Sequence, residues 1–420
     1  MLVENSFPAD TRVRNEAGTL AANGYRVSVI SLRSPGQRWR EVVDGVMVYR
    51  VPRLTVFDKL PQGDPSGLGK LARRLRTIFG YLTEYCYFTS ACLGLSFYVL
   101  VKEGFDVIHA HNPPDTLVLV TSVHKLLGRK VVFDHHDLSP ELYLSRYRTD
   151  GEGVITKGLR LLEKLSVKCA DVVIATNESY RAVDIERNGA APERVFIVRN
   201  GPDARRVRLM EPDPRLRGLN KKILVYVGAM NPQDGLDHLL KAIQHLLRDL
   251  KRTDFHCVLI GSGDSLDELR TQAQTLGIND YVEFTGFIPD EDLVRYLSTA
   301  DICLDPNPSS PLNDVSTWIK VMEYMALAKP VVSFDLKETR VSAGPAAQYA
   351  PPNDEYAFAT VIAGLMDDPA RCLEMGRVGV SRIQTDLGWH VTSQNLLRAY
   401  DFLFARATAT QPAKTNEPAA

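Results

Sequence analysis

The sequence lacks paired cysteines. Its six cysteines are scattered along 420 residues, and no two of them form a CxxC pair. This spacing argues against a zinc ribbon and a disulfide framework, because both need closely or regularly paired thiols. We interpret the cysteines as buried thiols in a reducing compartment, and we expect a cytoplasmic protein.

The sequence also lacks an excess of charge of either sign. It has 50 Lys and Arg residues against 51 Asp and Glu residues, which leaves a formal net charge of -1. A nucleic-acid-binding protein usually carries a basic footprint, so we expect no nucleic-acid partner. Any anion that the protein binds must therefore meet a local site.

A secretory signal and a long hydrophobic run are missing too. The chain opens MLVENSFPAD, without the basic segment and apolar core of a signal peptide. Residues 85–101 are 17 uncharged residues, at the lower limit for a spanning helix. We expect a buried helix there. The first strand begins at Met1 itself, which indicates either a frayed sheet edge or a true start upstream.

Basic residues gather just before that stretch. Residues 70–82 place Lys70, Arg73, Arg74 and Arg76 beside aliphatic and aromatic side chains. Such a segment is typical of a helix that lies on an anionic membrane surface. A solvated basic face explains the same pattern, and both interpretations stay open.

Short apolar runs alternate with helical patterns in both halves of the chain. Examples are RVSVISL, DVIHAH, KVVFDHHD and DVVIATN in the first half, and KILVYVG, HCVLIG, ICLDP and PVVSF in the second. This alternation predicts an α/β protein with two doubly wound domains, whose strand ends face one cleft. We place the domains at residues 1–205 and 206–386, a further helix at 387–405 and a disordered tail at 406–420.

The helix before PVVSF carries a polar stripe. Ser316, Lys320 and Glu323 fall within about 60° of one another on one face. The helix leads directly into an internal strand, so we expect this stripe to face a cleft. A carboxylate can accept hydrogen bonds from both hydroxyls of a vicinal diol, and an ammonium group can meet a phosphate. The alternative is a surface Lys–Glu pair worth a few tenths of a kcal/mol.

Two glycine turns follow strands of the second half. VLIGSGDSLDELR places Gly261 and Gly263 before a helix, where backbone N–H groups can approach a ligand. GAMNPQDGLDHLLKA is a second such turn, with Gly228 at the strand end and Gly235 opening the helix. Leu266 stands where a GxGxxG pattern has its third glycine, which weakens a dinucleotide-dehydrogenase interpretation.

These segments together resemble the family 4 retaining glycosyltransferases of GT-B fold. VYVGAMNPQDGLDHLLKA, VLIGSGD, VEFTGFIPDEDLVRYLSTADICLDP and KVMEYMALAKPVV are similar to family segments, in the family's order. ENSFPADTRVRNEAGTLAANGYRVSVI, DVIHAHNPPD and VVFDHHDLSPELY resemble the branch that builds bacterial exopolysaccharide and lipid-linked surface glycans. The resemblance implies two Rossmann-like domains facing a central cleft, with acceptor contacts in the first and nucleotide-sugar contacts in the second. The helix at 387–405 would cross back to the first domain.

The resemblance also implies which residues contact the donor. Glu323 takes the role of the family's ribose-binding glutamate. The other expected donor contacts are Gly228, Gly261 and Gly263, the base-binding turn with Phe287 and Ile288, and the polar residues Ser316 and Asp314. The histidine that contacts the donor sugar or phosphate is His136 or His135, and we favour His136 because HD follows the strand as in relatives. His111 is a further candidate.

The sequence departs from the family at three places. Val315 stands where the family has a second glutamate, which leaves Asp314 or Asn313 as substitutes. The family's basic pair falls on Ala229 and Asp234. We therefore expect positive charge from Lys320, Arg340, Arg12 or Arg14, and we assign Lys320, Arg340 and His136 as the catalytic candidates. Ala328 stands where relatives often have a glycine, at a cost of about 1–2 kcal/mol if its backbone is left-handed.

The mechanism implied by the resemblance needs no metal and no cofactor. The nucleotide sugar is the donor, its leaving phosphate takes the proton of the acceptor, and no general base is assigned. We expect a glycan or polyprenyl-linked acceptor, and peripheral contact with the inner face of the membrane.

Other classes of protein remain alternatives. A metal hydrolase would use the HAH and HHD segments, with His109, His111, His136 and Asp137 as ligands. A chain that binds a nucleotide sugar without turnover would serve as a scaffold. An epimerase on the same architecture would need further acid–base carboxylates. The DED at residues 290–292 imitates a metal-binding DxD, but acidic capping of a helix explains it more simply.

Overall fold

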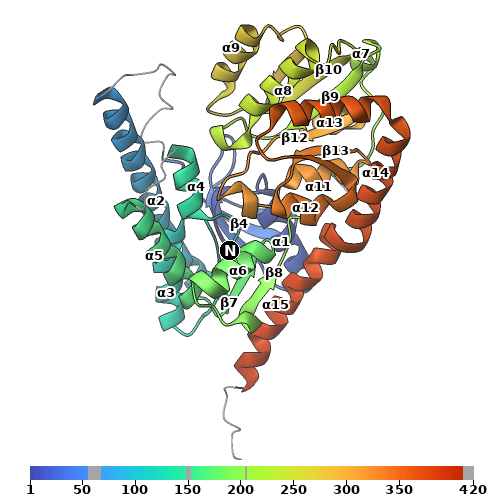
Figure 1. Ribbon diagram of the computed structural model, residues 1–420. Coiled ribbons are helices and arrows are strands. Elements are labelled where there is room, and N and C mark those ends of the chain that lie inside the picture. The colour runs from blue at the N-terminus through green and yellow to red at the C-terminus, as the bar shows by residue number, and fades with distance from the viewer. Residues whose placement is uncertain (55–67, 148–152, 204–205, 410–420) are drawn as a thin grey trace, which may run out of the picture. The chain divides into compact units, whose positions relative to one another are not determined.

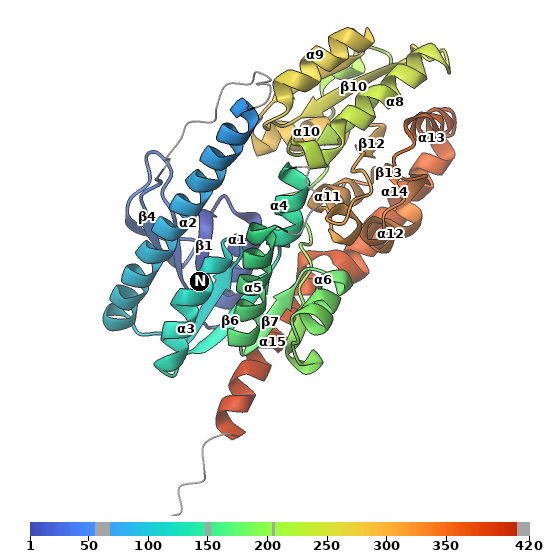
Figure 2. The same cartoon turned by 60° about the vertical axis from the view of Figure 1, so that its left-hand side comes forward.

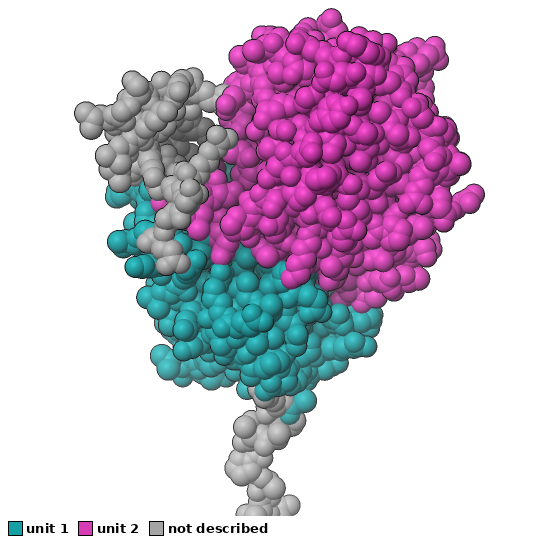
Figure 3. Space-filling view, in the orientation of Figure 1, with its two compact units in different colours: residues 1–140, 152–198, 393–420 teal, residues 141–151, 199–392 magenta. Residues whose placement is uncertain are grey.

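The computed structural model describes residues 1–54, 68–147, 153–203 and 206–409 (Figure 1). The chain forms two compact units, shown in different colours in Figure 3. Unit 1 comprises residues 1–140, 152–198 and 393–420, and unit 2 comprises residues 141–151 and 199–392. The division thus falls at 198/199, seven residues before the predicted boundary at 205/206.

Unit 1 is built on an eight-stranded sheet with strand order β3-β4-β2-β1-β5-β6-β7-β8. The strands pair in parallel, except that β3 is antiparallel to β4. Their bounds are β1 Leu2–Ser6, β2 Ser28–Leu32, β3 Arg40–Val43, β4 Val46–Val51, β5 Val107–His111, β6 Lys130–His135, β7 Val172–Ala175 and β8 Val195–Ile197. Of the two alternatives left open for the first strand, the frayed sheet edge is wrong. The first strand lies in the sheet interior between β2 and β5, and both Leu2 and Val3 are buried.

The helices of unit 1 cover both faces of this sheet. Helices α2, α3 and α5 lie side by side on one face (Figure 2). The bounds are α1 Thr11–Ala22, α2 Leu68–Lys102, α3 Val118–Leu126, α4 Ser139–Tyr147, α5 Val154–Cys169 and α6 Glu178–Ala182. Most of α4 belongs to unit 2 by its contacts. Helix α15, Trp389–Ala409, begins in unit 2 and continues in unit 1 from Ser393. The predicted disordered tail therefore begins at least four residues too early, and residues 410–420 lie outside the described part of the chain.

The stretch predicted as a buried helix is only partly buried. It belongs to α2, where Phe88, Cys92 and Val99 pack inward while Phe79 and Val101 are exposed. The part of α2 at Ile78–Lys102 is long and apolar enough to cross a membrane by length and composition alone, and 28% of its apolar window is buried. The side chains of the basic residues at 70–74 lie outside the described residues.

Unit 2 is built on a six-stranded parallel sheet with strand order β11-β10-β9-β12-β13-β14. Its strands are β9 Lys222–Val227, β10 Phe255–Ile260, β11 Val282–Gly286, β12 Ile302–Asp305, β13 Val331–Phe334 and β14 Ala347–Ala350. The helices are α7 Pro214–Arg217, α8 Leu236–Arg248, α9 Leu266–Leu276, α10 Asp290–Thr299, α11 Ile319–Ala326, α12 Lys337–Ala343, α13 Glu355–Asp367 and α14 Pro369–Arg382. The prediction of two doubly wound parallel domains is confirmed. In such a sheet, ligands bind beyond the carboxyl ends of the strands.

Candidate functional site

Helix α11 of unit 2 carries two of the three polar residues of the predicted stripe, Lys320 and Glu323, whereas Ser316 precedes the helix, which begins only at Ile319. Lys320 and Glu323 are each only 8% exposed, although the helix is just eight residues long. The alternative of a solvent-exposed Lys–Glu pair is therefore wrong. Burial of a charged group is costly unless that group is paired, so the partners of each residue decide what it can do.

The ammonium group of Lys320 is enclosed by polar and aromatic groups. Its Nζ atom lies 2.5 Å from Asn307 Oδ1 and 3.3 Å from Asp305 Oδ1. The same atom lies 4.7 Å from the ring centre of Tyr226 and 5.1 Å from that of Trp318, within the range of cation–π attraction. These contacts hold the charge at the carboxyl end of β12.

The position of Lys320 bears on the missing basic pair. Burial raises the pKa of Asp234, and the charge of nearby Lys320 acts in the opposite direction. Lys320 thus lies close to Asp234, one of the two positions where the family resemblance implies a basic residue. A side chain from α11 brings positive charge to this turn after β9.

The carboxylate of Glu323 has a partner that the sequence did not indicate. Its Oε1 atom accepts a hydrogen bond from Arg206 Nη2 at 2.7 Å. Arg206 also binds Asp290 Oδ2 through Nη1 at 3.1 Å. Burial raises the pKa of Glu323, and Arg206 opposes that effect. Arg206 escaped prediction because it lies in the polar segment between the domains, outside any recognisable motif.

The glycines predicted to lie beside the donor are required by the packing of unit 2. A Cβ atom on Gly261 would lie 1.9 Å from the carbonyl oxygen of Gly228, and one on Gly263 would lie 2.5 Å from that of Met230. The φ angle of Gly261 is +130°, which also favours glycine. The turns after β9 and β10 therefore pack backbone against backbone, which explains these glycines without a ligand.

The turn predicted to meet the base follows β11. Phe287 is 85% exposed, whereas Ile288 is half-buried and packs against the core of unit 2. Gly286 has a φ angle of +72°, which turns the chain before them. Of the two predicted base contacts, Phe287 thus offers the more accessible side chain.

The residues around the missing glutamate are tied into a loop. Asn313 is buried and donates hydrogen bonds from Nδ2 to the carbonyl oxygens of Gln233 and Pro308, both at 2.9 Å. Its Oδ1 atom is buried without a hydrogen-bond partner in the described part of the chain. Asp314 accepts from Ser309 Oγ at 3.1 Å, and Ser316 donates to the Leu312 carbonyl at 2.7 Å. The Oδ1 atom of Asn313 can thus still accept a hydrogen bond.

Arg340 lies on α12 and is paired at the surface. Its guanidinium donates to both carboxylate oxygens of Asp335, at 2.6 and 2.5 Å, and lies 4.3 Å from the ring centre of Tyr349. The side chain is 55% exposed. Its assignment as a catalytic residue stays a prediction, and Lys320 is the better placed of the two cations.

In unit 1, the carboxylate of Asp134 at the end of β6 organises a buried polar cluster. Arg12 Nε and Nη2 donate to its two oxygens, both at 2.6 Å, and Arg12 also lies 3.2 Å from Glu16. Arg12 is buried, and its Nη1 donates to the Val198 carbonyl at 2.9 Å. Because the guanidinium of Arg12 already binds this cluster, Arg12 is poorly placed to meet a phosphate, and its role there stays a prediction. Arg14 is half-buried and lies 3.4 Å from the Pro8 carbonyl.

The three predicted histidines differ in exposure. His111 Nδ1 lies 2.8 Å from Asp134 Oδ2, and His136 Nδ1 lies 3.2 Å from the same atom. The side chain of His136 is 18% exposed, whereas those of His111 and His135 are fully buried. His136 is thus the most accessible of the three candidates, and the roles of all three as ligand contacts stay predictions.

The three histidines also differ in the direction of their pKa shifts. Burial would lower the pKa of His136, but the hydrogen bond and charge of Asp134 raise it overall. The pKa of His111 is lowered, because burial outweighs Asp134 there. His135 lies 2.7 Å from Asp184, and the carboxylates of Asp184 and Glu163 raise its pKa well above the ordinary value despite burial.

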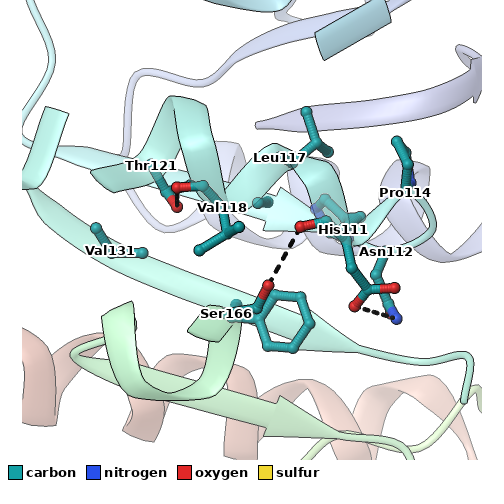
Figure 4. Close-up of a pocket in the computed structure, with 11 residues that line it drawn as sticks. His111, Asn112, Pro114, Leu117, Val118, Thr121, Val131 and Ser166 are labelled. Carbon is teal, nitrogen blue, oxygen red and sulfur yellow. Dashed lines mark hydrogen bonds between the residues drawn. The ribbon is translucent and has the colours of Figure 1, made fainter. Parts of the chain in front are cut away.

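Asn112 fixes the loop that carries His136. Its Oδ1 atom accepts from the backbone N–H groups of His136 at 3.0 Å and of Asp137 at 3.3 Å. Its Nδ2 atom donates to the Asp137 carbonyl at 2.6 Å. The same atom lies 3.4 Å from Asp115 Oδ1 (Figure 4). Asn112 lies in the segment DVIHAHNPPD, but the sequence predicted no role for it.

The same cluster contains donor atoms that suit a metal ion. Donor atoms of Glu16, His109, His111 and Asp134 all lie within 4.8 Å of one another. Only His109 and His111 belong to the metal set considered from the sequence. Arg12 already contacts both carboxylates, so a cation balances their charge at this place.

Two family models match the chain in tandem. Residues 9–201 match "Glycosyl transferase 4-like domain" and residues 221–368 match "Glycosyl transferases group 1". A D-inositol 3-phosphate glycosyltransferase of Corynebacterium efficiens is 26% identical over 402 residues, which cover 91% of this chain and 87% of that protein.

Solved structures show the same architecture. Sucrose-phosphate synthase from Thermosynechococcus elongatus superposes with a TM-score of 0.71 at 21% identity, over 96% of this chain and 95% of that one. Anabaena Alr3699/HepE in complex with UDP-glucose superposes with a TM-score of 0.69 at 16% identity, over 95% of this chain and 98% of that one. At these identities the likeness shows the fold.

Proposed function

Because the chain is a glycosyltransferase of the GT-B fold, with one matched glycosyltransferase domain in each half, we propose that it transfers a sugar from a nucleotide-sugar donor with retention of configuration. We assign it to family 4 and to cytoplasmic synthesis of exopolysaccharide or another surface glycan. The observation that carries this proposal is the pair of buried charges on α11, Lys320 and Glu323, beside the strand-end turns of unit 2.

The donor site that we propose lies in unit 2. Glu323 accepts hydrogen bonds from the ribose hydroxyls, and Lys320 meets the diphosphate near the turn that begins at Gly228. The support is that both side chains are held in place by neighbours, at the strand ends where α/β sheets bind ligands. A structural neighbour whose title names UDP-glucose, Alr3699/HepE, supports a nucleotide sugar as the donor.

The proposed reaction breaks the bond between the sugar anomeric carbon and the donor phosphate oxygen. The acceptor hydroxyl oxygen forms the new bond to that carbon, and its proton passes to the departing phosphate. Negative charge develops on the phosphate in the transition state, so a fixed cation such as Lys320 lowers the barrier. His136, whose pKa is raised by Asp134, donates a hydrogen bond to the donor sugar or phosphate in this proposal. We propose no metal ion or cofactor in this step.

We further propose a glycan or polyprenyl-linked acceptor and peripheral contact with the membrane. The support comes from the exposed side chains of α5. Val154, Leu161 and Leu165 are exposed, and so are Lys157 and Lys164 on the same helix. Apolar residues flanked by lysines suit an anionic lipid surface. Co-sedimentation with anionic and zwitterionic vesicles tests this contact, and equal recovery with both contradicts it.

The test of the proposed function is a transfer assay on the full chain. UDP-, GDP-, ADP- and dTDP-linked sugars are offered with a polyprenyl-diphosphate-linked sugar, with and without EDTA, and release of the nucleoside diphosphate is measured. We expect one donor to be consumed equally well with EDTA, and NMR to show the donor's anomeric configuration in the product. Binding without turnover would favour the scaffold alternative, and turnover abolished by EDTA would contradict the metal-free mechanism.

A further inference from the structure

Arg206 links two parts of the proposed donor site. Its Nη2 atom donates to Glu323 Oε1 at 2.7 Å, and its Nη1 atom lies 3.1 Å from Asp290 Oδ2. Glu323 is the proposed ribose contact. Asp290 begins α10, three residues after Phe287 in the turn proposed to meet the base. One guanidinium thus bridges the two elements that would hold the nucleoside.

The backbone holds Arg206 in unit 2. The N–H groups of Arg206 and Val207 both donate to the Asp203 carbonyl at 2.9 Å. Val207 is buried in the core of unit 2, and the Met210 N–H donates to Ser298 Oγ at 3.0 Å. The segment that carries Arg206 is therefore fixed to the unit that carries Glu323, and these backbone contacts hold Arg206 in place.

The pair leaves both residues with capacity for a ligand. The side chain of Glu323 is 10% exposed and that of Arg206 is 28% exposed. Arg206 occupies one carboxylate oxygen of Glu323, and a carboxylate has two oxygens with about four acceptor positions. A guanidinium has five N–H donors and a flat face that stacks on aromatic rings. The remaining donors and face of Arg206 can meet a nucleoside while Glu323 meets its diol.

We propose that Arg206 is a nucleotide-recognition residue, which fixes the carboxylate of Glu323 for the ribose diol and contacts the nucleoside itself. This inference rests on the proposed function. It names the substrate class more narrowly, because a carboxylate held in one orientation discriminates a ribonucleotide from its 2′-deoxy counterpart. Arg206 is a positioning residue toward Glu323 and a binding residue toward the nucleotide.

The experiment measures nucleotide affinity and ribose preference on the full chain by calorimetry. The probes are UDP, GDP and ADP, each beside its 2′-deoxy counterpart. The variants are Arg206→Ala and Arg206→Lys, and the control is Arg215→Ala, which removes an arginine of α7 that is paired with Glu283 at the surface. We expect Arg206→Ala to weaken ribonucleotide binding at least tenfold and to bring the ratio of deoxy to ribo dissociation constants close to one. Arg206→Lys retains a charge without the fork and should fall between, whereas Arg215→Ala should match the wild type.

The outcomes separate this inference from the proposed function. A wild type that binds none of the probes overturns this inference, and one that also fails to bind dTDP overturns the proposed function as well. A wild type that binds, with Arg206→Ala showing the same affinity and the same ribose preference, overturns the role of Arg206 alone. A merely structural role of Arg206 would lower the melting temperature without ligand and leave the ribose preference intact. Should Arg206→Ala fail to fold, Arg206→Lys supplies the same two readouts, and an unchanged preference there counts against the inference.

Discussion

The carboxylate of Asp134 lies 3.2 Å from Nδ1 of His136 and thereby joins a buried polar cluster to a partly exposed ring. Asp134 is itself held by two hydrogen bonds from Arg12. The negative charge of Asp134 favours the protonated imidazole, and the pKa of His136 is raised as a result, although burial acts against it. In the proposed reaction, the protonated form of His136 is the form that donates to the donor sugar or phosphate.

Replacement of Asp134 should therefore change how activity depends on pH. With a raised pKa, His136 is protonated at low pH and loses its proton as the pH rises through that pKa, so activity should fall along this limb. In Asp134→Asn the limb should move to lower pH by about one unit or more, since a nearby opposite charge typically shifts a pKa by 1–3 units. Profiles of kcat/KM against pH measure it. A limb at the same pH in both proteins would show that His136 does not supply the protonated group.

Removal of the Lys320 ammonium group should slow turnover more than it weakens donor binding. A charge that stabilises the leaving phosphate acts mainly in the transition state, and loss of one such group costs about 10²-fold or more in kcat. Lys320→Met keeps the length of the side chain, and steady-state kinetics measure kcat and KM. The matched control is Lys241→Met, a lysine on α8 paired with Glu355 at the surface, which should retain wild-type kcat. Equal kcat in all three proteins would remove Lys320 from the site.

Ala328→Gly should stabilise the protein. Ala328 ends the turn after α11 with a φ angle of +55°, in the left-handed region where an alanine side chain is strained. Glycine removes that strain, and we expect the free energy of unfolding to rise by about 1 kcal/mol. Ala326→Gly, two residues earlier in helical conformation, is the matched control and should lose about 0.5–1 kcal/mol. Urea unfolding measures both, and a loss of stability in Ala328→Gly would contradict this assignment.

The buried ring of His135 should make stability depend on pH. Its pKa is raised well above 6.5, because Asp184 and Glu163 outweigh burial. The protonated ring then contributes stability that is fully present below pH 6.5 and is lost as the pH rises through the folded pKa. We expect the free energy of unfolding to fall above pH 6.5, with up to about 1.4 kcal/mol per pH unit from this group. His135→Gln should be less stable and should show a shallower slope between pH 6.5 and 8.5. An identical slope would contradict the assignment.

The sequence predicted the architecture because hydrophobic periodicity depends on each element alone. Buried parallel strands such as β9 and β10 read as continuous apolar runs, and the glycines between them are required by backbone contact. The interior place of β1 was not predicted, since strand order depends on contacts between distant segments. The partial exposure of α2 was not predicted either, because the composition of a helix does not determine how much of its surface other helices cover.

Site residues were predicted from the sequence only where a local pattern, such as the periodicity of one helix, singled them out. Glu323 and Lys320 stood out by their shared helix face. The burial of Arg12 depends on Asp134, which is 122 positions away in the chain. The contact of Arg206 with Glu323 spans 117 positions. Such pairings arise from tertiary packing. Neither the contact of Arg12 with Asp134 nor that of Arg206 with Glu323 could therefore be predicted from a local sequence pattern.

The most direct test of the central claim is the thermal shift of the wild type and of Glu323→Ala with UDP, GDP, ADP and dTDP, with and without EDTA. A nucleotide at about 100 times its dissociation constant adds roughly 2.7 kcal/mol to the stability of the native state. We predict that one nucleotide raises the melting temperature of the wild type, that EDTA leaves this shift unchanged, and that Glu323→Ala loses most of it. The same shift in Glu323→Ala, or no shift with any nucleotide in the wild type, would contradict a donor site built on Glu323.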